Sequence, residues 1–307
     1  MIGIQAVSEW ICTTRLDNRN RIEGLDASES LLNDKIGVMQ IARLESGEET
    51  SDLCVHAINK LLSETNLAKD DIQCLVVVTQ NPDGTGLPHT SAITHGKLGL
   101  PRSCATFDVA LGCSGYVYGL TIIKSFMEGC GFTKGILVTA DPYSKVVSMD
   151  DRDTSLLFGD GASATLLSDT PTWTIGSGDF GTVGELNDAL KVQDNGKLYM
   201  NGRSVFSFSA TTVPDSIKRT LDNNSSTLHN IDRFVLHQGS RFIVDTIAKR
   251  LEIEDRTSFC AQKYGNLVSS SIPVAFRDLV ESNDKNVIIS GFGVGLSWAS
   301  NLLTRVS

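Results

Sequence analysis

The sequence lacks a long hydrophobic run, an excess of basic residues and a leader-like beginning. No uninterrupted apolar segment of the 307-residue chain approaches the roughly 18 residues that cross a bilayer, so we expect no membrane association. Lysine and arginine total 27 against 36 aspartates and glutamates, a net charge of −9. We therefore expect no nucleic-acid partner, because no cationic surplus neutralises phosphates. The first residues contain no basic cluster followed by an apolar run, which disfavours a signal peptide.

Paired cysteines are also missing. The seven cysteines are scattered and form no C-x-x-C pair, which disfavours a zinc ribbon or a dithiol redox site. Free, dispersed thiols are typical of a reducing compartment, so we expect a cytoplasmic protein. A literal G-x-G-x-x-G match at residues 176–181 is not followed by a helical pattern, so it does not indicate a dinucleotide site.

What the sequence does contain is an internal repetition. Residues 67–80 and 228–238 each lead from a polar helix exit into an apolar strand that ends in a polar pair. Each is followed by a helical pattern and a second apolar strand, at residues 113–127 and 134–140 in one case and 241–251 and 285–290 in the other. Short Val/Ile/Leu strands alternating with helices are typical of a buried parallel sheet. The repetition predicts a duplicated α/β unit, with halves at residues 1–169 and 170–307.

Cys113 is the cysteine with the most informative surroundings. It follows a strand-like run at residues 105–110 and precedes a helical stretch, with Gly112 before it and Gly115 shortly after. A cysteine on a turn entering a helix lies near the positive end of the helix dipole, which favours the thiolate and lowers the thiol pKa. The alternative is a small buried hydrophobic residue, which is the reading we favour for the other six cysteines.

Three further candidates lie in the second half. His237 stands at the exit of an apolar strand, where open α/β sheets place ligands, although a structural histidine also fits. Asn266 lies in a tight turn before a run of small residues. The glycine-rich segment 291–298 can direct backbone N–H groups at an anionic oxygen. Together they indicate a nucleophilic cysteine with an oxyanion hole, although a thiol protease uses the same residue types.

The whole chain resembles the condensing enzymes of the thiolase superfamily, most closely the ketoacyl-acyl-carrier-protein synthase III family. The matching segments occur in the family's order at residues 107–120, 157–162, 200–206, 237–238, 264–266 with 271–273, and 291–298. The resemblance implies a thiolase-like duplicated five-layered α/β/α/β/α fold and an obligate homodimer. It implies no metal or redox cofactor, with acyl-coenzyme A or acyl carrier protein and malonyl-acyl carrier protein as substrates.

The resemblance also implies site residues. Cys113, His237 and Asn266 would be the catalytic triad, and the backbone N–H groups of Cys113 and Val294 would form the oxyanion hole. Cys113 would carry the acyl group of a primer thioester. His237 and Asn266 would stabilise the enolate formed when the malonyl group loses carbon dioxide, giving a 3-oxoacyl product. Acyl-pocket residues would be Phe206 and, reaching across the dimer, Leu87; substrate or carrier protein would contact Arg152, Lys249 and Arg250.

Several positions depart from the family. Gly239 and Ser240 replace the family's Ala-Asn after the His-Gln pair, Leu31 replaces a tryptophan that stacks on adenine, and Lys35 replaces an arginine. These departures leave open an acyltransferase of the same fold that acts on an oxygen or nitrogen nucleophile in specialised metabolism. A non-catalytic partner subunit of a synthase is a further alternative, against which the complete triad argues. For Lys249 and Arg250 the alternative role is pairing with a helix C-terminus.

Overall fold

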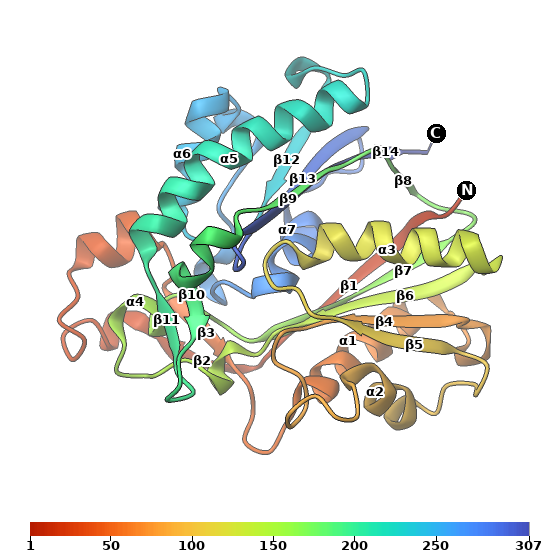
Figure 1. Ribbon diagram of the computed structural model, residues 1–307, viewed down its shortest axis with the longest axis horizontal. Coiled ribbons are helices and arrows are strands. Elements are labelled where there is room, and N and C mark those ends of the chain that lie inside the picture. The colour runs from red at the N-terminus through yellow and green to blue at the C-terminus, as the bar shows by residue number, and fades with distance from the viewer. Residues whose placement is uncertain (307) are drawn as a thin grey trace.

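The computed structural model describes residues 1–306, and a mixed sheet of two halves forms its centre (Figure 1). In spatial order, the first half contains β5 (Ala105–Val109), β4 (Cys74–Val78), β6 (Lys134–Ala140), β7 (Gly161–Ser168) and β1 (Gly3–Ile11). The second half contains β8 (Trp173–Ile175), β14 (Ser297–Arg305), β13 (Asn286–Gly293) and β12 (Arg233–Leu236), with β9 (Asp179–Thr182) also paired to β14. The halves meet where Ile4 pairs with Trp173.

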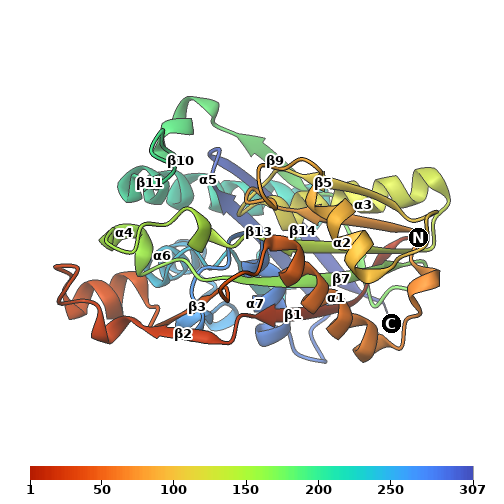
Figure 2. The same cartoon turned by 90° about the horizontal axis from the view of Figure 1, so that it is seen from below.

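The helices complete five layers, which confirms the fold that the family resemblance implied. On the outer face of the first half lie α1 (Thr50–Thr65) and α2 (Thr90–Leu98), which face the viewer in Figure 2. Between the two halves lie α3 (Gly115–Cys130) and α7 (Ser271–Leu279), each in contact with strands of both. On the far side of the second half lie α5 (Gly202–Asn223) and α6 (Arg241–Leu251).

The strands are less uniformly parallel than the sequence predicts. Only β4, β5 and β6 in the first half and β12 with β13 in the second are parallel. Helices connect these strands, as parallel neighbours require. By contrast, β13 turns directly into β14, and such a direct connection makes the pair antiparallel. The predicted strand at residues 134–140 and helix at 241–251 have the bounds of β6 and α6.

Smaller elements gather at one end of the molecule, away from the two termini (Figure 1). They are β2 (Thr14–Asp17), β3 (Gln40–Arg43), a π-helical turn over Leu31–Ile36, α4 (Arg152–Ser155), β10 (Leu190–Val192) and β11 (Leu198–Met200). None of the helices in residues 1–306 combines the length and the hydrophobicity that crossing a bilayer requires. The end that carries these small elements is where the cavity described next opens.

Candidate active site

Cys113, His237 and Asn266 line one cavity of about 330 Å³. Each lies in a connection beyond a strand or before a helix: Cys113 between β5 and α3, His237 after β12, and Asn266 ahead of α7. Their exposed fractions are only 3%, 2% and 3%. The fold therefore brings together, from two halves of the chain, the three side chains that the family resemblance assigns to catalysis.

The sulfur of Cys113 lies against the end of β13. A Cβ atom placed on Gly293 would be 2.7 Å from Cys113 Sγ, so a side chain at this position would occupy the space that the sulfur needs. The backbone N–H groups of Val294 and of Cys113 itself are directed at the sulfur and favour its ionised form. These are the two N–H groups that the resemblance assigns to the oxyanion hole, and both lie at the Cys113 sulfur.

Burial raises the pKa of the Cys113 thiol to about 12, because desolvation outweighs the two backbone N–H groups. The shift is therefore opposite in direction to the lowered thiol pKa that the sequence predicts. The first helical residue of α3 is Gly115, and the sulfur is enclosed by β13 rather than open to water. The thiol is consequently neutral at pH 7.

His237 is also held neutral. Its imidazole packs edge-on against the Phe292 ring, with centroids 5.5 Å apart and an interplanar angle of 88°. Within residues 1–306, its Nδ1 atom is buried without a hydrogen-bond partner. Burial lowers the pKa of His237 to about 3, because the charged ring loses its hydration. A neutral imidazole carries one N–H group and can donate it to a substrate oxygen.

Asn266 is fixed through its oxygen. Its Oδ1 accepts hydrogen bonds from the Val268 backbone N–H at 2.9 Å and from Ser271 Oγ at 3.1 Å. Its backbone N–H donates to the Leu157 carbonyl at 2.9 Å. Because the oxygen is held from two sides, the Nδ2 amide group remains as the donor that this side chain offers to a molecule in the cavity.

The cavity wall is mostly apolar and includes Phe206, the predicted acyl-pocket residue. Phe206 stacks on Phe242 with centroids 5.0 Å apart, and Lys35 Nζ lies 3.7 Å from the centroid of the Phe242 ring. Phe242 and Phe292 were not predicted as site residues; proximity to His237 and to the glycine-rich segment was the available signal. The apolar lining consists of Leu31, Ile36, Leu157, Phe158, Leu190, Met200, Val205, Phe206, Phe242, Ile243 and Phe292.

The other predicted residues lie outside this cavity. Leu87, on the connection between β4 and α2, is 91% exposed. Arg152 is exposed on α4 and pairs with Asp153, its Nε 3.0 Å from Asp153 Oδ1. Lys249 and Arg250 are exposed at the end of α6, and Arg250 also donates to the Ala210 carbonyl on α5 at 2.8 Å. Within residues 1–306, no group of three His, Cys, Asp or Glu side chains gathers as a metal-binding cluster.

Comparison with known proteins identifies relatives over the full length. The pattern of the family "3-Oxoacyl-[acyl-carrier-protein (ACP)] synthase III" matches residues 107–184, and the pattern of its C-terminal part matches residues 221–305. A "Beta-ketoacyl-[acyl-carrier-protein] synthase III" of Clostridioides difficile (strain 630) is 30% identical over 98% of this chain and 97% of the relative.

Solved structures are similar as well. A crystal structure of a 3-oxoacyl-(acyl-carrier-protein) synthase III is 31% identical, with a TM-score of 0.92 over 99% of both chains. The priming beta-ketosynthase from the R1128 polyketide biosynthetic pathway is 25% identical, with a TM-score of 0.89 over 99% of this chain and 96% of that one.

Proposed function

Because the chain belongs to the 3-oxoacyl-[acyl-carrier-protein] synthase III family, we propose that it condenses an acyl thioester with malonyl-acyl carrier protein and releases carbon dioxide. It is a condensing enzyme of the transferase class, and the product is a 3-oxoacyl carrier protein. The observation that carries the proposal is the convergence of Cys113, His237 and Asn266 on one cavity, with two backbone N–H groups at the sulfur.

In the first half-reaction, Cys113 Sγ bonds to the carbonyl carbon of the primer thioester. The carbon–sulfur bond of the primer breaks, and its thiol leaves with the proton that Cys113 gives up. The carbonyl oxygen gains negative charge in the transition state, and the N–H groups of Cys113 and Val294 stabilise it there. Neutral surroundings that disfavour the free thiolate do not oppose this step, because the charge passes to the oxygen that these groups bind.

In the second half-reaction, the malonyl thioester loses carbon dioxide, and the electron pair of the broken carbon–carbon bond forms an enolate. Its oxygen accepts hydrogen bonds from His237 and from the Asn266 amide. The enolate carbon then attacks the acyl group, and the Cys113 sulfur leaves as a thiolate that takes up one proton from solvent to restore the thiol. A neutral His237 fits this role, because the uncharged imidazole keeps one N–H group and can donate it without first taking up a proton.

We further propose that the chain acts as a homodimer. Strand β5 is paired with β4 alone among the described strands, and it is only half-buried along its length. Phe107, Tyr118, Phe126 and Phe180 are partly exposed in this region, as Leu87 is fully. A second copy that pairs along β5 would cover these side chains and carry Leu87 toward the partner's acyl pocket.

The carrier protein is proposed to approach the end of α6. Lys249 and Arg250 are exposed there, and Phe242 and Ile243 of the same helix line the cavity. An acidic carrier protein would be attracted by these two cations, which stand out on a chain whose net charge is −9. Seven free thiols support a cytoplasmic location. The halves at 1–169 and 170–307 are proposed as the two repeats of the duplicated unit.

The test uses the purified protein and weighs it intact after incubation with acyl-coenzyme A and acyl-carrier thioesters. We expect a single acyl adduct that Cys113→Ala abolishes, and carbon dioxide when malonyl-acyl carrier protein is added. The panel also identifies the primer carrier, which the Leu31 and Lys35 departures leave open. An adduct on Cys113→Ala, or no adduct with any donor, contradicts the proposal. Acyl transfer to an alcohol or amine without carbon dioxide would support the acyltransferase alternative.

A further inference from the structure

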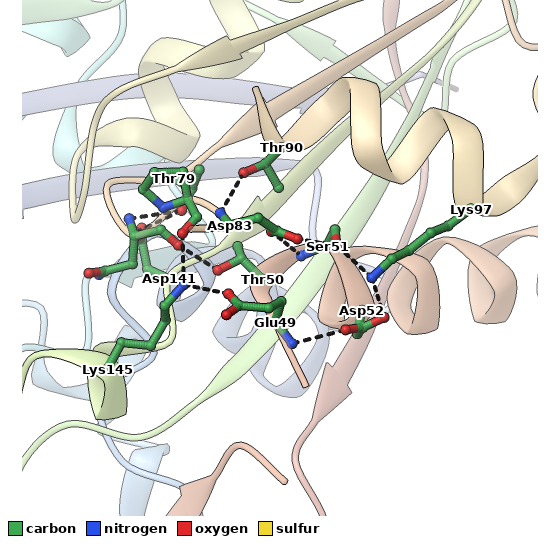
Figure 3. Close-up of polar contacts among 12 residues, drawn as sticks. Glu49, Thr50, Ser51, Asp52, Thr79, Asp83, Thr90, Lys97, Asp141 and Lys145 are labelled. Carbon is green, nitrogen blue, oxygen red and sulfur yellow. Dashed lines mark hydrogen bonds and ion pairs between the residues drawn. The ribbon is translucent and has the colours of Figure 1, made fainter. Parts of the chain in front are cut away.

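A buried carboxylate outside the triad connects the parts of the site. Asp141 follows β6 directly and is fully buried. Its Oδ1 accepts hydrogen bonds from the Gln80 backbone N–H at 2.7 Å and from Thr79 Oγ1 at 3.3 Å. Its Oδ2 accepts one from Ser269 Oγ at 2.6 Å. Figure 3 shows the carboxylate beside the chain that leaves β4 at Thr79. The bonds therefore join a strand exit of the first half to a segment of the second.

The segment that Ser269 belongs to is the turn that holds Asn266, and its backbone is strained. Val268, a β-branched residue, has a φ of 52°, in the left-handed region that such side chains avoid. Residues in such conformations persist only where the surroundings hold them in place. Here Ser269 is bound to Asp141, and Ser270 Oγ donates to the Thr139 carbonyl at 2.9 Å. The end of β6 thus holds the turn whose Val268 N–H fixes the Asn266 oxygen.

The other side of Asp141 faces the wall behind Cys113. Gln80, whose backbone N–H the carboxylate accepts, places its side chain against the connection that precedes Cys113. A Cβ atom on Gly112 would be 2.6 Å from Gln80 Oε1, so the two groups are in direct contact. The same strand exit continues into the loop at residues 80–89. That loop is tied to α1 by Asp83, whose carboxylate accepts from the Ser51 backbone N–H and hydroxyl at 2.8 and 2.6 Å (Figure 3).

We propose that Asp141 is a positioning residue for condensation: one carboxylate holds the strained Asn266 turn through Ser269 and the wall behind Cys113 through Gln80. The proposal rests on the function given above, because it concerns the geometry of that reaction. Loss of the Ser269 contact is expected to affect the two half-reactions to different extents. Acylation needs Cys113 and its N–H groups, whereas only the condensation step uses the Asn266 amide. Loosening the Ser269 side should therefore slow condensation far more than acylation.

The negative charge of Asp141 also affects the reactivity of the Cys113 thiol, which a residue that acts only through its hydrogen bonds would not change. The titratable groups that respond to it are the thiols of Cys113 and Cys54 and the phenol of Tyr143, all buried. The ammonium of Lys145, in the same polar network, is occupied by Glu49 Oε2 at 2.6 Å and the Pro82 carbonyl at 2.7 Å (Figure 3). The negative charge of Asp141 raises the pKa of Cys113, so its removal should increase the reactivity of this thiol.

The experiment measures both half-reactions in Ser269→Ala and Asp141→Asn, with Ser216→Ala as the matched control. Ser216 is a buried serine on α5 that bonds to Ser300 at 2.9 Å, away from the cavity. We expect Ser269→Ala to acylate within about twofold of wild type and to release carbon dioxide at least about tenfold more slowly, because a misplacement near 1 Å is costly to a positioned group. Asp141→Asn should slow condensation at least as much as Ser269→Ala does, and it should show faster iodoacetamide labelling of Cys113 at pH 8. Ser216→Ala should match wild type in both steps.

The outcomes separate the two proposals. If wild type is acylated and condenses normally while Ser269→Ala condenses at the wild-type rate, the positioning role is wrong and the function stands. If the control slows as much as Ser269→Ala, the effect is general destabilisation and the inference also fails. If wild type itself forms no adduct, the proposed function fails first. Should Asp141→Asn not fold, the Ser269→Ala result decides alone.

Discussion

Cys113 Sγ and the backbone of Gly293 are in such close contact that a methyl group on Gly293 would lie 2.7 Å from the sulfur. We therefore expect Gly293→Ala to displace the sulfur or the β13 end and to slow acylation by on the order of 100-fold, the scale lost when a reacting group is misplaced. Intact mass during single-turnover acylation measures this rate.

Gly239 provides the matched control for that substitution. A Cβ atom there would meet only ordinary contacts, the nearest being His237 Cδ2 at 3.4 Å and Ile243 Cδ1 at 3.7 Å. Gly239→Ala restores the residue usual in the family and should acylate as wild type does. Its unfolding free energy should rise by about 0.4–1 kcal/mol, because the unfolded chain loses freedom. A Gly293→Ala variant as active as Gly239→Ala would contradict the contact described here.

The neutral state of the Cys113 thiol predicts how alkylation depends on pH. With a pKa of about 12, the thiolate fraction rises about tenfold per pH unit below that value. Iodoacetamide labelling of Cys113, followed by peptide mass, should therefore increase steadily from pH 7 to about 10 without a plateau. A plateau near neutral pH would mean that the end of α3 overcomes burial, as the sequence alone predicts.

Asp141 predicts a second pH effect, this time on stability. Burial raises the pKa of Asp141 from 3.8 to about 7, so the folded state holds a proton that the unfolded state releases between these values. The contribution of Asp141 to stability is therefore present at low pH and lost as pH rises from about 4 to 7. As pH rises through this window, the unfolding free energy of Asp141→Asn should increase relative to that of wild type by about 1.4 kcal/mol per pH unit. Urea unfolding of both proteins at several pH values measures this difference. A difference between the two proteins that is independent of pH would contradict this.

Leu87 tests the proposed dimer. Its side chain is 91% exposed on the single chain, so Leu87→Asp should leave each chain folded, with the far-ultraviolet dichroism of wild type. If Leu87 enters the acyl pocket of a second copy, the same variant should lower the acylation rate for long-chain primers more than for acetyl. Light scattering checks that the variant keeps its oligomeric state. Unchanged acylation with all primers would argue against the shared pocket.

Cys113, His237 and Asn266 could be selected as candidates from the sequence, because each has a local signal and the family resemblance names all three. Cys113 stands between a strand and a helix, His237 ends a strand, and Asn266 lies in a glycine turn. The thiol pKa could not be predicted, because it depends on enclosure by β13, which only the folded chain creates. Asp141 gave no signal, since a single aspartate after a strand is common and its partner Ser269 is 128 positions away. The prediction of a parallel sheet was wrong for strands that are joined without an intervening helix, such as β13 and β14.

The middle layer has a consequence for how this protein can fail. Cys113 precedes β6, whereas His237 and Asn266 lie more than a hundred positions later, and α3 and α7 each contact strands of both sheet halves. Neither half of the sheet alone therefore carries all three residues of the proposed site. A small shift of the two sheet halves relative to each other would leave both halves folded but would separate the three side chains. On mild heating, activity should therefore be lost before the far-ultraviolet dichroism changes.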